Sequence, residues 1–227
     1  MVSENLVDVM ARIAKAARKV GRDPGEVNLI AVTKSVEAKK LKEALSGGAR
    51  IFGENYVQEA DEKIKKVRDG SIKWHFIGHL QKNKVKVAVE LFDVIETVDT
   101  IELATEINKR AKEPLEVFIE VNIAKEKTKA GVYPDAVIKL AKGISALPML
   151  RLTGLMSIPP SLPDAEASRP YFITLRRLAE RVNKEQIPGV FIRNLSMGMS
   201  GDYEVAVEEG ATFVRVGTAI FGQRPHK

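Results

Sequence analysis

The chain has 227 residues, of which 44% are hydrophobic and 29% are charged, and it carries a formal net charge of +6 at pH 7. This balance is typical of a folded globular protein and excludes a disordered or fibrous one. Cysteine is absent, which excludes disulfides, thiolate catalysis and zinc–thiolate sites and is consistent with a reducing compartment.

Residues 1–20 mix charged side chains with apolar ones at helical spacing. This pattern predicts a helix and lacks the uninterrupted apolar core of a signal peptide. No run approaches the roughly 20 apolar residues of a transmembrane helix. We therefore expect a cytoplasmic protein that has no membrane partner.

Eight short apolar segments then alternate with helical patterns. Most of these segments are apolar on both alternating faces, as parallel strands covered on both sides are. Helical patterns with one apolar face span 36–46, 99–111 and 170–182. The expected strands are 27–34, 50–54, 73–78, 93–98, 115–122, 151–157, 190–196 and 213–217.

Local signals mark the ends of several helices. Asn55 and Asp99 are each followed three residues later by Gln or Glu, the spacing of a reciprocal helix cap. Gly47–Gly48 and Gly143 suit left-handed helix ends.

The order of elements predicts an α/β fold, a single (β/α)8 TIM barrel over residues 1–227 with an extra N-terminal helix. An open doubly wound sheet is the alternative, but its Gly-x-Gly-x-x-Gly turn is absent after the first strand.

Lys34 ends the first expected strand. In a barrel of this kind the loops after the strands meet at one rim, where sites assemble. Ile30 and Val32 share the strand face of Lys34, so its amine would point into apolar surroundings at the barrel mouth. Burial lowers the pKa of a lysine and leaves neutral amine to condense with an aldehyde. On position alone, a lysine whose amine reaches water is the simpler interpretation.

Two clusters at the last two strands favour the cofactor interpretation. Ser-Met-Gly-Met-Ser-Gly at 196–201 follows the seventh strand, and Gly217-Thr218 follows the eighth. Glycine N–H groups, hydroxyls and a helix opening near Asp202 can bind phosphate. Loops after strands seven and eight are the recurrent phosphate site of this fold, although each cluster taken singly is also an ordinary turn and cap.

Arg215 lies on the eighth strand between Phe213 and Gly217 on the same face, so its guanidinium should point inward. A cation there would keep a pyridine nitrogen unprotonated and weaken the cofactor as an electron sink. The alternative is a salt bridge to an inward acid such as Glu120.

Six motifs in order along the chain carry a family resemblance. They are Ala-Val-Thr-Lys at 31–34, Phe-Gly-Glu-Asn-Tyr-Val-Gln-Glu at 52–59, Trp-His-Phe-Ile-Gly-His-Leu-Gln at 74–81, Gly-Leu-Met-Ser at 154–157, Ser-Met-Gly-Met-Ser at 196–200 and Arg-Val-Gly-Thr-Ala-Ile-Phe-Gly at 215–222. Over essentially its whole length the chain resembles the pyridoxal phosphate homeostasis proteins, which are alanine racemase-like, fold-type III proteins that bind pyridoxal 5'-phosphate (PLP).

The resemblance implies a role for each candidate residue. Lys34 would hold PLP as a Schiff base, Arg215 would face the pyridine nitrogen, and the phosphate would be bound by Ser200, Gly217 and Thr218. Asn55 and Met156 would neighbour the cofactor ring, although a helix cap explains the first and core packing the second equally well.

The resemblance also implies a carrier, buffer or regulator of PLP that serves recipient apoenzymes, usually without turnover. The alternative is an amino-acid racemase or decarboxylase. Racemases of this fold resemble this chain plus a C-terminal domain that supplies a tyrosine base and dimer contacts. Because the sequence ends ten residues past Gly217, we expect a non-catalytic monomer.

The remaining features suggest no further ligand. The basic clusters at 63–66 and 82–86 lack interleaved aromatics, so we interpret them as solvated helix faces and expect no nucleic acid partner. His75 and His79 have the spacing of a metal pair on a helix, but the segment at 74–77 is expected to be a strand and no third ligand is evident. We therefore expect no metal.

Overall fold

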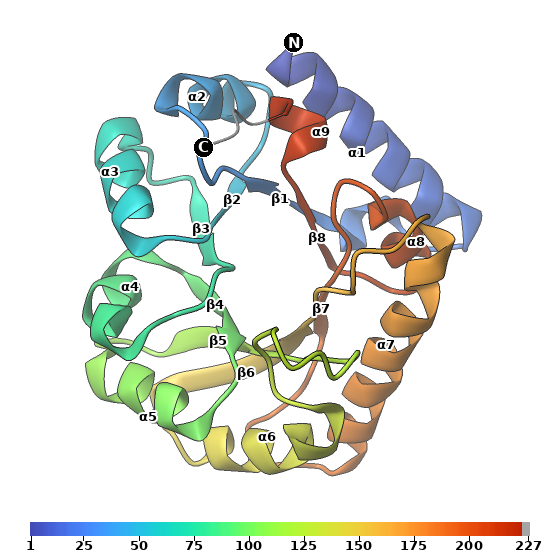
Figure 1. The fold of residues 1–227 in the computed structure, drawn as a ribbon. Helices are drawn as coiled ribbons and strands as arrows, with labels where there is room; N and C mark the ends of the chain where they lie inside the picture. The colour runs from blue at the N-terminus through green and yellow to red at the C-terminus, as the bar shows by residue number, and fades with distance from the viewer. Residues whose placement is uncertain (224–227) are drawn as a thin grey trace.

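The computed structural model describes residues 1–223, and its eight strands form a closed parallel barrel in the order β1 to β8. Each strand pairs with the next, and β1 also pairs with β8 to close the ring, as Figure 1 shows. The predicted TIM barrel is confirmed. The strands are β1 (Asn28–Val32), β2 (Ile51–Glu54), β3 (Lys73–Phe76), β4 (Val94–Val98), β5 (Leu115–Glu120), β6 (Leu150–Met156), β7 (Asn194–Ser196) and β8 (Phe213–Val216).

Helices surround the barrel and follow the strands in turn (Figure 1). None of them, within the described residues, is long and apolar enough to cross a membrane. The α-helices are α1 (Val2–Lys19), α2 (Ala38–Ser46), α3 (Val57–Val67), α4 (Val85–Leu91), α5 (Ile101–Arg110), α6 (Val137–Ser145), α7 (Arg169–Lys184), α8 (Tyr203–Glu208) and α9 (Thr218–Phe221). Short 3-10 turns are η1 (Pro24–Glu26), η2 (Lys82–Lys84), η3 (Pro134–Ala136) and η4 (Glu166–Ser168).

The extra N-terminal helix, α1, is also present as predicted. Its buried stripe includes Leu6, Val9 and Ile13, which recur at helical spacing. The helix packs against α8 and α9, and Asn5 Nδ2 donates to the carbonyl of Ile220 at 2.9 Å. Because α9 begins at the barrel mouth, α1 fixes part of the wall around the mouth from outside.

The core has two parts, because the strands carry buried residues on both faces. The larger part lies between the barrel and the surrounding helices. The smaller lies inside the barrel, where Val94, Phe118 and Met156 pack together against Phe213. Polar side chains fill the rest of the interior toward the mouth, so the barrel is a packed core with a polar upper layer.

Several predicted boundaries were wrong. The N-terminal caps of helices α3 and α5 lie one residue later than expected, at Tyr56 and Thr100 in place of Asn55 and Asp99. Thr100 is the effective cap, because its Oγ1 accepts a hydrogen bond from Leu103 N at 3.2 Å.

The two predicted glycine stops differ. Gly48 adopts the expected left-handed conformation, with φ of +104°. Gly143 instead lies inside α6, where a Cβ would meet the side chain of Ile101 at 2.8 Å, so close packing explains this glycine.

Strand β7 begins at Asn194 and not at 190. The segment before it is held outside the sheet by Asn183, whose side-chain amide bonds both the N–H and the carbonyl of Ile192, at 2.8 and 2.9 Å. Arg193 N then reaches Thr153 O and starts the pairing with β6.

Candidate functional site

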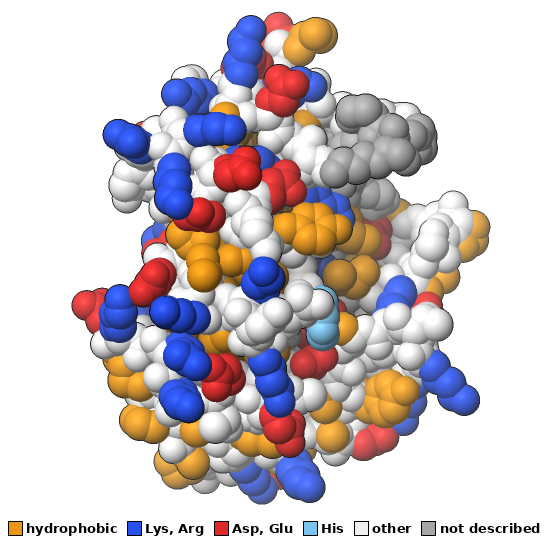
Figure 2. Space-filling view, turned by 60° about the vertical axis from the view of Figure 1, so that its left-hand side comes forward, with side chains coloured by type: hydrophobic (Ala, Val, Ile, Leu, Met, Phe, Trp, Pro, Cys, Tyr) orange, Lys and Arg blue, Asp and Glu red, His pale blue; other side chains and the backbone are white. Residues whose placement is uncertain are grey.

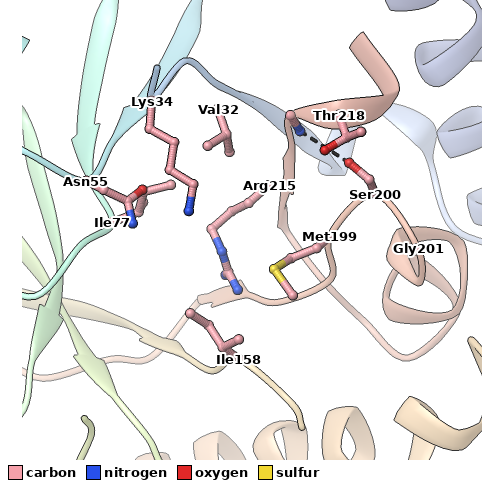
Figure 3. A pocket seen from close by; sticks show the side chains of 11 residues that line it. Val32, Lys34, Asn55, Ile77, Ile158, Met199, Ser200, Gly201, Arg215 and Thr218 are labelled. Atoms are coloured by element: carbon pink, nitrogen blue, oxygen red, sulfur yellow. Dashed lines mark hydrogen bonds between the residues drawn. The ribbon is translucent and has the colours of Figure 1, made fainter. Parts of the chain in front are cut away.

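A cavity of about 250 Å³ opens at the barrel mouth, beside the carboxyl ends of β1 and β8. Figure 3 shows Lys34 and Arg215 extending toward each other across it, with Ser200 and Thr218 on the opposite side from Asn55. The structure therefore brings together six of the seven predicted site residues. The lining consists of Val32, Lys34, Asn55, Ile77, Ile158, Met199, Ser200, Gly201, Arg215, Gly217 and Thr218.

Lys34 lies two residues beyond the end of β1, in the turn that leaves the barrel. The next residue, Ser35, has a φ of +58°, a left-handed conformation that is uncommon for a residue other than glycine. The backbone therefore turns sharply at the lysine, whose side chain is directed over the barrel mouth instead of outward to solvent (Figure 3).

A buried ionic cluster behind β1 fixes the residues on both sides of Lys34. Lys63 Nζ donates to Glu54 Oε1 and Glu59 Oε1, both at 2.7 Å, and also to the carbonyl of Thr33. Glu59 Oε1 in turn accepts from Ser35 N at 2.5 Å. The interpretation of residues 63–66 as a solvated face was therefore wrong for Lys63, which is 6% exposed.

Glu54 is the most buried member of this cluster. Burial raises the pKa of its carboxyl, and the adjacent positive charge of Lys63 and the hydroxyl of Thr33 oppose that rise. Thr33 Oγ1 donates to the same Oε1 atom at 2.6 Å. The cluster thus links β1, β2 and α3 at the point where the candidate lysine leaves the strand.

The loop after β7 supplies the hydroxyl side of the cavity. Gly198 permits this loop because its φ is +90° and because a Cβ there would meet that of Ala206 at 2.5 Å. The loop places Ser200 Oγ 3.3 Å from Gly217 N, from which it accepts a long hydrogen bond (Figure 3). Ser200 Oγ also accepts a hydrogen bond from Ala219 N at 3.4 Å. Backbone donors at the start of α9 and a serine hydroxyl therefore face one space, a donor set that suits a phosphate group.

Arg215 forms the floor of the cavity and is 4% exposed. Its Nη1 donates to Ser196 Oγ at 2.7 Å, and its Nη2 donates to the carbonyl of Ser157 at 2.8 Å. Burial lowers the pKa of the guanidinium, and the negative charges of Glu96 and Glu120 oppose that change.

The alternative partner of Arg215, Glu120, forms no salt bridge with it among the ion pairs of the described residues. Burial and the nearby Asp99 raise the pKa of Glu120 to about 7, and the charge of Arg215 limits that rise. Glu120 lines a neighbouring cavity together with Lys129 and Ile158.

The two expected ring neighbours lie in different places. Asn55 lines the cavity, and its buried Oδ1 has no hydrogen-bond partner within the described residues, so an acceptor is available there. Met156 does not line this cavity. Its side chain packs with Val94 and Phe118, because the alternation along β6 directs it into the apolar layer of the barrel.

His75 and His79 diverge and do not form a pair. His75 Nδ1 lies 2.6 Å from Glu96 Oε1 inside the barrel, whereas His79 lines a separate cavity with Tyr56 and Lys84. The described part of the chain contains no cluster of three or more His, Asp or Glu side chains that could hold a metal. Sequence reasoning missed the pairing of His75 with Glu96, although a carboxylate inside an otherwise apolar strand was a signal for it.

The fold and the site define a TIM barrel with one lysine after β1 and a phosphate-type donor set at β7 and β8. The profile of the alanine racemase N-terminal domain family matches residues 5–225, and the chain belongs to this family.

Its full-length relatives carry a more specific name. A pyridoxal phosphate homeostasis protein of Aquifex aeolicus is 42% identical over 226 residues, which cover 98% of each chain. The structure of PipY from Synechococcus elongatus with PLP bound is 35% identical, with a TM-score of 0.85 over 98% of this chain and 100% of that one. Alanine racemase of Clostridium difficile shares the fold, with a TM-score of 0.73 at 14% identity, and this chain covers 58% of its length.

Proposed function

We propose that the protein binds PLP through Lys34 and acts in PLP homeostasis, as a carrier, buffer or regulator of the cofactor. Residues 1–227 would form a single PLP-binding domain, although residues 224–227 lie outside the described part. The observation that carries the proposal is the convergence of one lysine, one buried arginine and a phosphate-type donor set on a single cavity.

The residues present fit PLP at both of its ends. The amine of Lys34 can attack the aldehyde carbon, form a C=N bond and release the aldehyde oxygen as water, which gives a Schiff base. Ser200, Gly217 and Thr218 would hold the phosphate with hydroxyl and backbone donors. The unpartnered Oδ1 of Asn55 would accept a hydrogen bond from the ligand.

Arg215 determines what kind of cofactor site this is. PLP supplies an aldehyde and a pyridine ring that withdraws electrons most strongly when its nitrogen is protonated. A fixed guanidinium facing that nitrogen would keep it unprotonated, so the bound cofactor would be a weak electron sink. This arrangement supports storage of PLP over rapid turnover.

The alternative function is amino-acid racemisation, which needs a base on each face of the substrate. Lys34 could serve on one face. Tyr56 and Tyr203 lie away from this cavity. Tyr56 lines the cavity that contains His79, and Tyr203 is buried beneath Arg12. We therefore favour the carrier, and alanine or serine racemisation that is lost in Lys34→Ala would reverse this preference.

We propose that the partners of the protein are recipient apoenzymes. We also propose that it is a cytoplasmic monomer that binds neither nucleic acid nor membrane. Figure 2 supports the first exclusion, because Lys and Arg side chains on the face shown are interspersed with Asp and Glu. Salt bridges such as Lys65–Asp61 and Lys112–Glu90 also neutralise exposed lysines. A continuous basic tract would favour nucleic acid instead.

The test is to add PLP to the purified protein, record the visible absorption band, reduce with borohydride and map the modified peptide by mass spectrometry. We expect modification of Lys34 in the wild type and in Lys42→Ala, a control at an exposed lysine of α2. Modification at a different lysine in the wild type, or no stable adduct, would contradict the proposal.

A further inference from the structure

A continuous line of buried polar side chains crosses the barrel directly beneath the cavity. Glu96 is at its centre, with Oε1 2.6 Å from His75 Nδ1 and Oε2 accepting from Ser196 Oγ at 2.5 Å. Ser196 Oγ also accepts from Arg215 Nη1 at 2.7 Å. The four side chains come from β3, β4, β7 and β8, and each is at most 4% exposed.

This line lies against an apolar layer, which makes its presence informative. The ring centroids of Phe213 and His75 are 5.3 Å apart. Val94 lies two residues before Glu96 on β4 and therefore on the same face of the strand. Burying a carboxylate and a guanidinium costs free energy that packed apolar side chains would not. Stability alone therefore does not explain why both oxygens of Glu96 are committed to this line.

The line ends on the group that faces the cofactor site. A guanidinium has five N–H donors in a rigid plane, and two of those of Arg215 are used on Ser196 Oγ and the carbonyl of Ser157. These two contacts set the orientation of the plane, and Figure 3 shows the guanidinium directed into the cavity. Of the acids whose charge acts on Arg215, which are Glu96, Glu120 and Asp202, hydrogen bonds connect only Glu96 to it within the described residues.

We propose that Glu96 is a positioning residue for Arg215. It acts through the hydroxyl of Ser196, which bonds both side chains, and its own orientation is fixed by the contact with His75. Glu96 holds the guanidinium plane through the serine hydroxyl and supplies the negative charge that balances the cation beneath the cofactor. The inference rests on the proposed function, because its consequence is a tuned proton affinity of the lysine–cofactor linkage. Arg215 would be the group that touches the ring, and Glu96 would act through it.

Four variants separate this role from a structural one. Glu96→Gln keeps the shape but removes the charge, and Ser196→Ala breaks the relay while keeping both charges. Thr97→Val is the matched control, because Thr97 is buried on the same strand and donates one hydrogen bond, to Gly78 O at 2.7 Å, without touching the line. Ser196→Thr retains a hydroxyl and should rescue the relay.

The first readout is the pH titration of the visible band of the PLP-loaded protein. With Glu96→Gln the site gains net positive charge, so protonation of the linkage nitrogen becomes less favourable. We expect its apparent pKa to fall by about one pH unit, the scale of one perturbed charge interaction. Ser196→Ala should shift it in the same direction by less, and Thr97→Val and Ser196→Thr should leave it unchanged.

The second readout needs no cofactor. In the apo-protein, NMR of the Arg215 side-chain nitrogens reports rotation of the guanidinium. This rotation should accelerate by about tenfold in Ser196→Ala, the scale of one lost hydrogen bond, and remain slow in Thr97→Val. Equal titration curves and equal rotation rates in all variants would overturn the inference. Borohydride mapping on the same samples keeps the two claims apart: label on Lys34 with unchanged curves contradicts only the relay, whereas no label on Lys34 in the wild type contradicts the proposed function.

Discussion

Replacing Lys63 with methionine should destabilise the protein strongly, even though a lysine on a helix is usually replaceable. The substitution leaves Glu54, which is fully buried, with Thr33 as its remaining side-chain partner. Removing one partner of a buried ion pair typically costs about 3–5 kcal/mol. The second pair, with the partly exposed Glu59, adds a smaller contribution.

Two controls identify the cause. Lys65→Met on the same helix breaks a salt bridge to Asp61 in which the lysine is 70% exposed, so little or no change is expected. The double variant Lys63→Met/Glu54→Gln removes the orphaned charge and should recover much of the loss.

The assay is urea unfolding followed by circular dichroism at several pH values. Burial already raises the pKa of Glu54 in the folded protein, so the folded state binds a proton more tightly than the unfolded state, and stability falls as pH rises through the folded pKa. Loss of Lys63 should enlarge this effect, so Lys63→Met should lie closer to wild type at pH 5 than at pH 8. A cost below about 1 kcal/mol, or one that is independent of pH and of Glu54→Gln, would refute the reasoning.

Two further predictions concern the cavity and its neighbour. Ser200→Ala should weaken PLP binding by about tenfold to a hundredfold, which is the scale of a hydrogen bond to a charged group. The affinity for pyridoxal, which lacks the phosphate, should be nearly unchanged. Equal losses for both ligands in a fluorescence titration would argue against a phosphate contact. Glu120→Gln should flatten the pH dependence of stability between about pH 4.5 and 7. The folded pKa of about 7 lies above the ordinary glutamate pKa of 4.5. The folded wild-type protein therefore has up to about 3 kcal/mol of added stability below this window and loses it as pH rises through 7. Parallel wild-type and variant curves in urea titrations from pH 4 to 8 would disprove this assignment.

Much of the fold could be predicted because its signals are local. Apolar segments such as 115–122 and 213–217 give strands, and the glycine and serine clusters after the last two strands give the side of the mouth that carries Ser200. The role of Lys34 could be predicted only after a closed barrel was assumed, since pairing of β1 with β8 is what brings Lys34 opposite Arg215.

The features that sequence reasoning missed are contacts between distant segments. Lys63 belongs to a charged run that is typical of a solvated helix, and its burial depends on Glu54 and Thr33 from two strands. Glu96 and Ser196 are 100 residues apart and meet only across the closed barrel. The cap at Thr100 was missed for a different reason, because a better-known spacing pattern began one residue earlier.

The most direct test of the central claim is a crystal structure of the protein grown with PLP. We expect continuous electron density from the side chain of Lys34 to the aldehyde carbon of the cofactor, with the phosphate against Ser200, Gly217 and Thr218 and the ring nitrogen facing Arg215. Density for a free ligand in this cavity, attachment at another lysine, or a phosphate bound away from the loops after β7 and β8 would contradict the account.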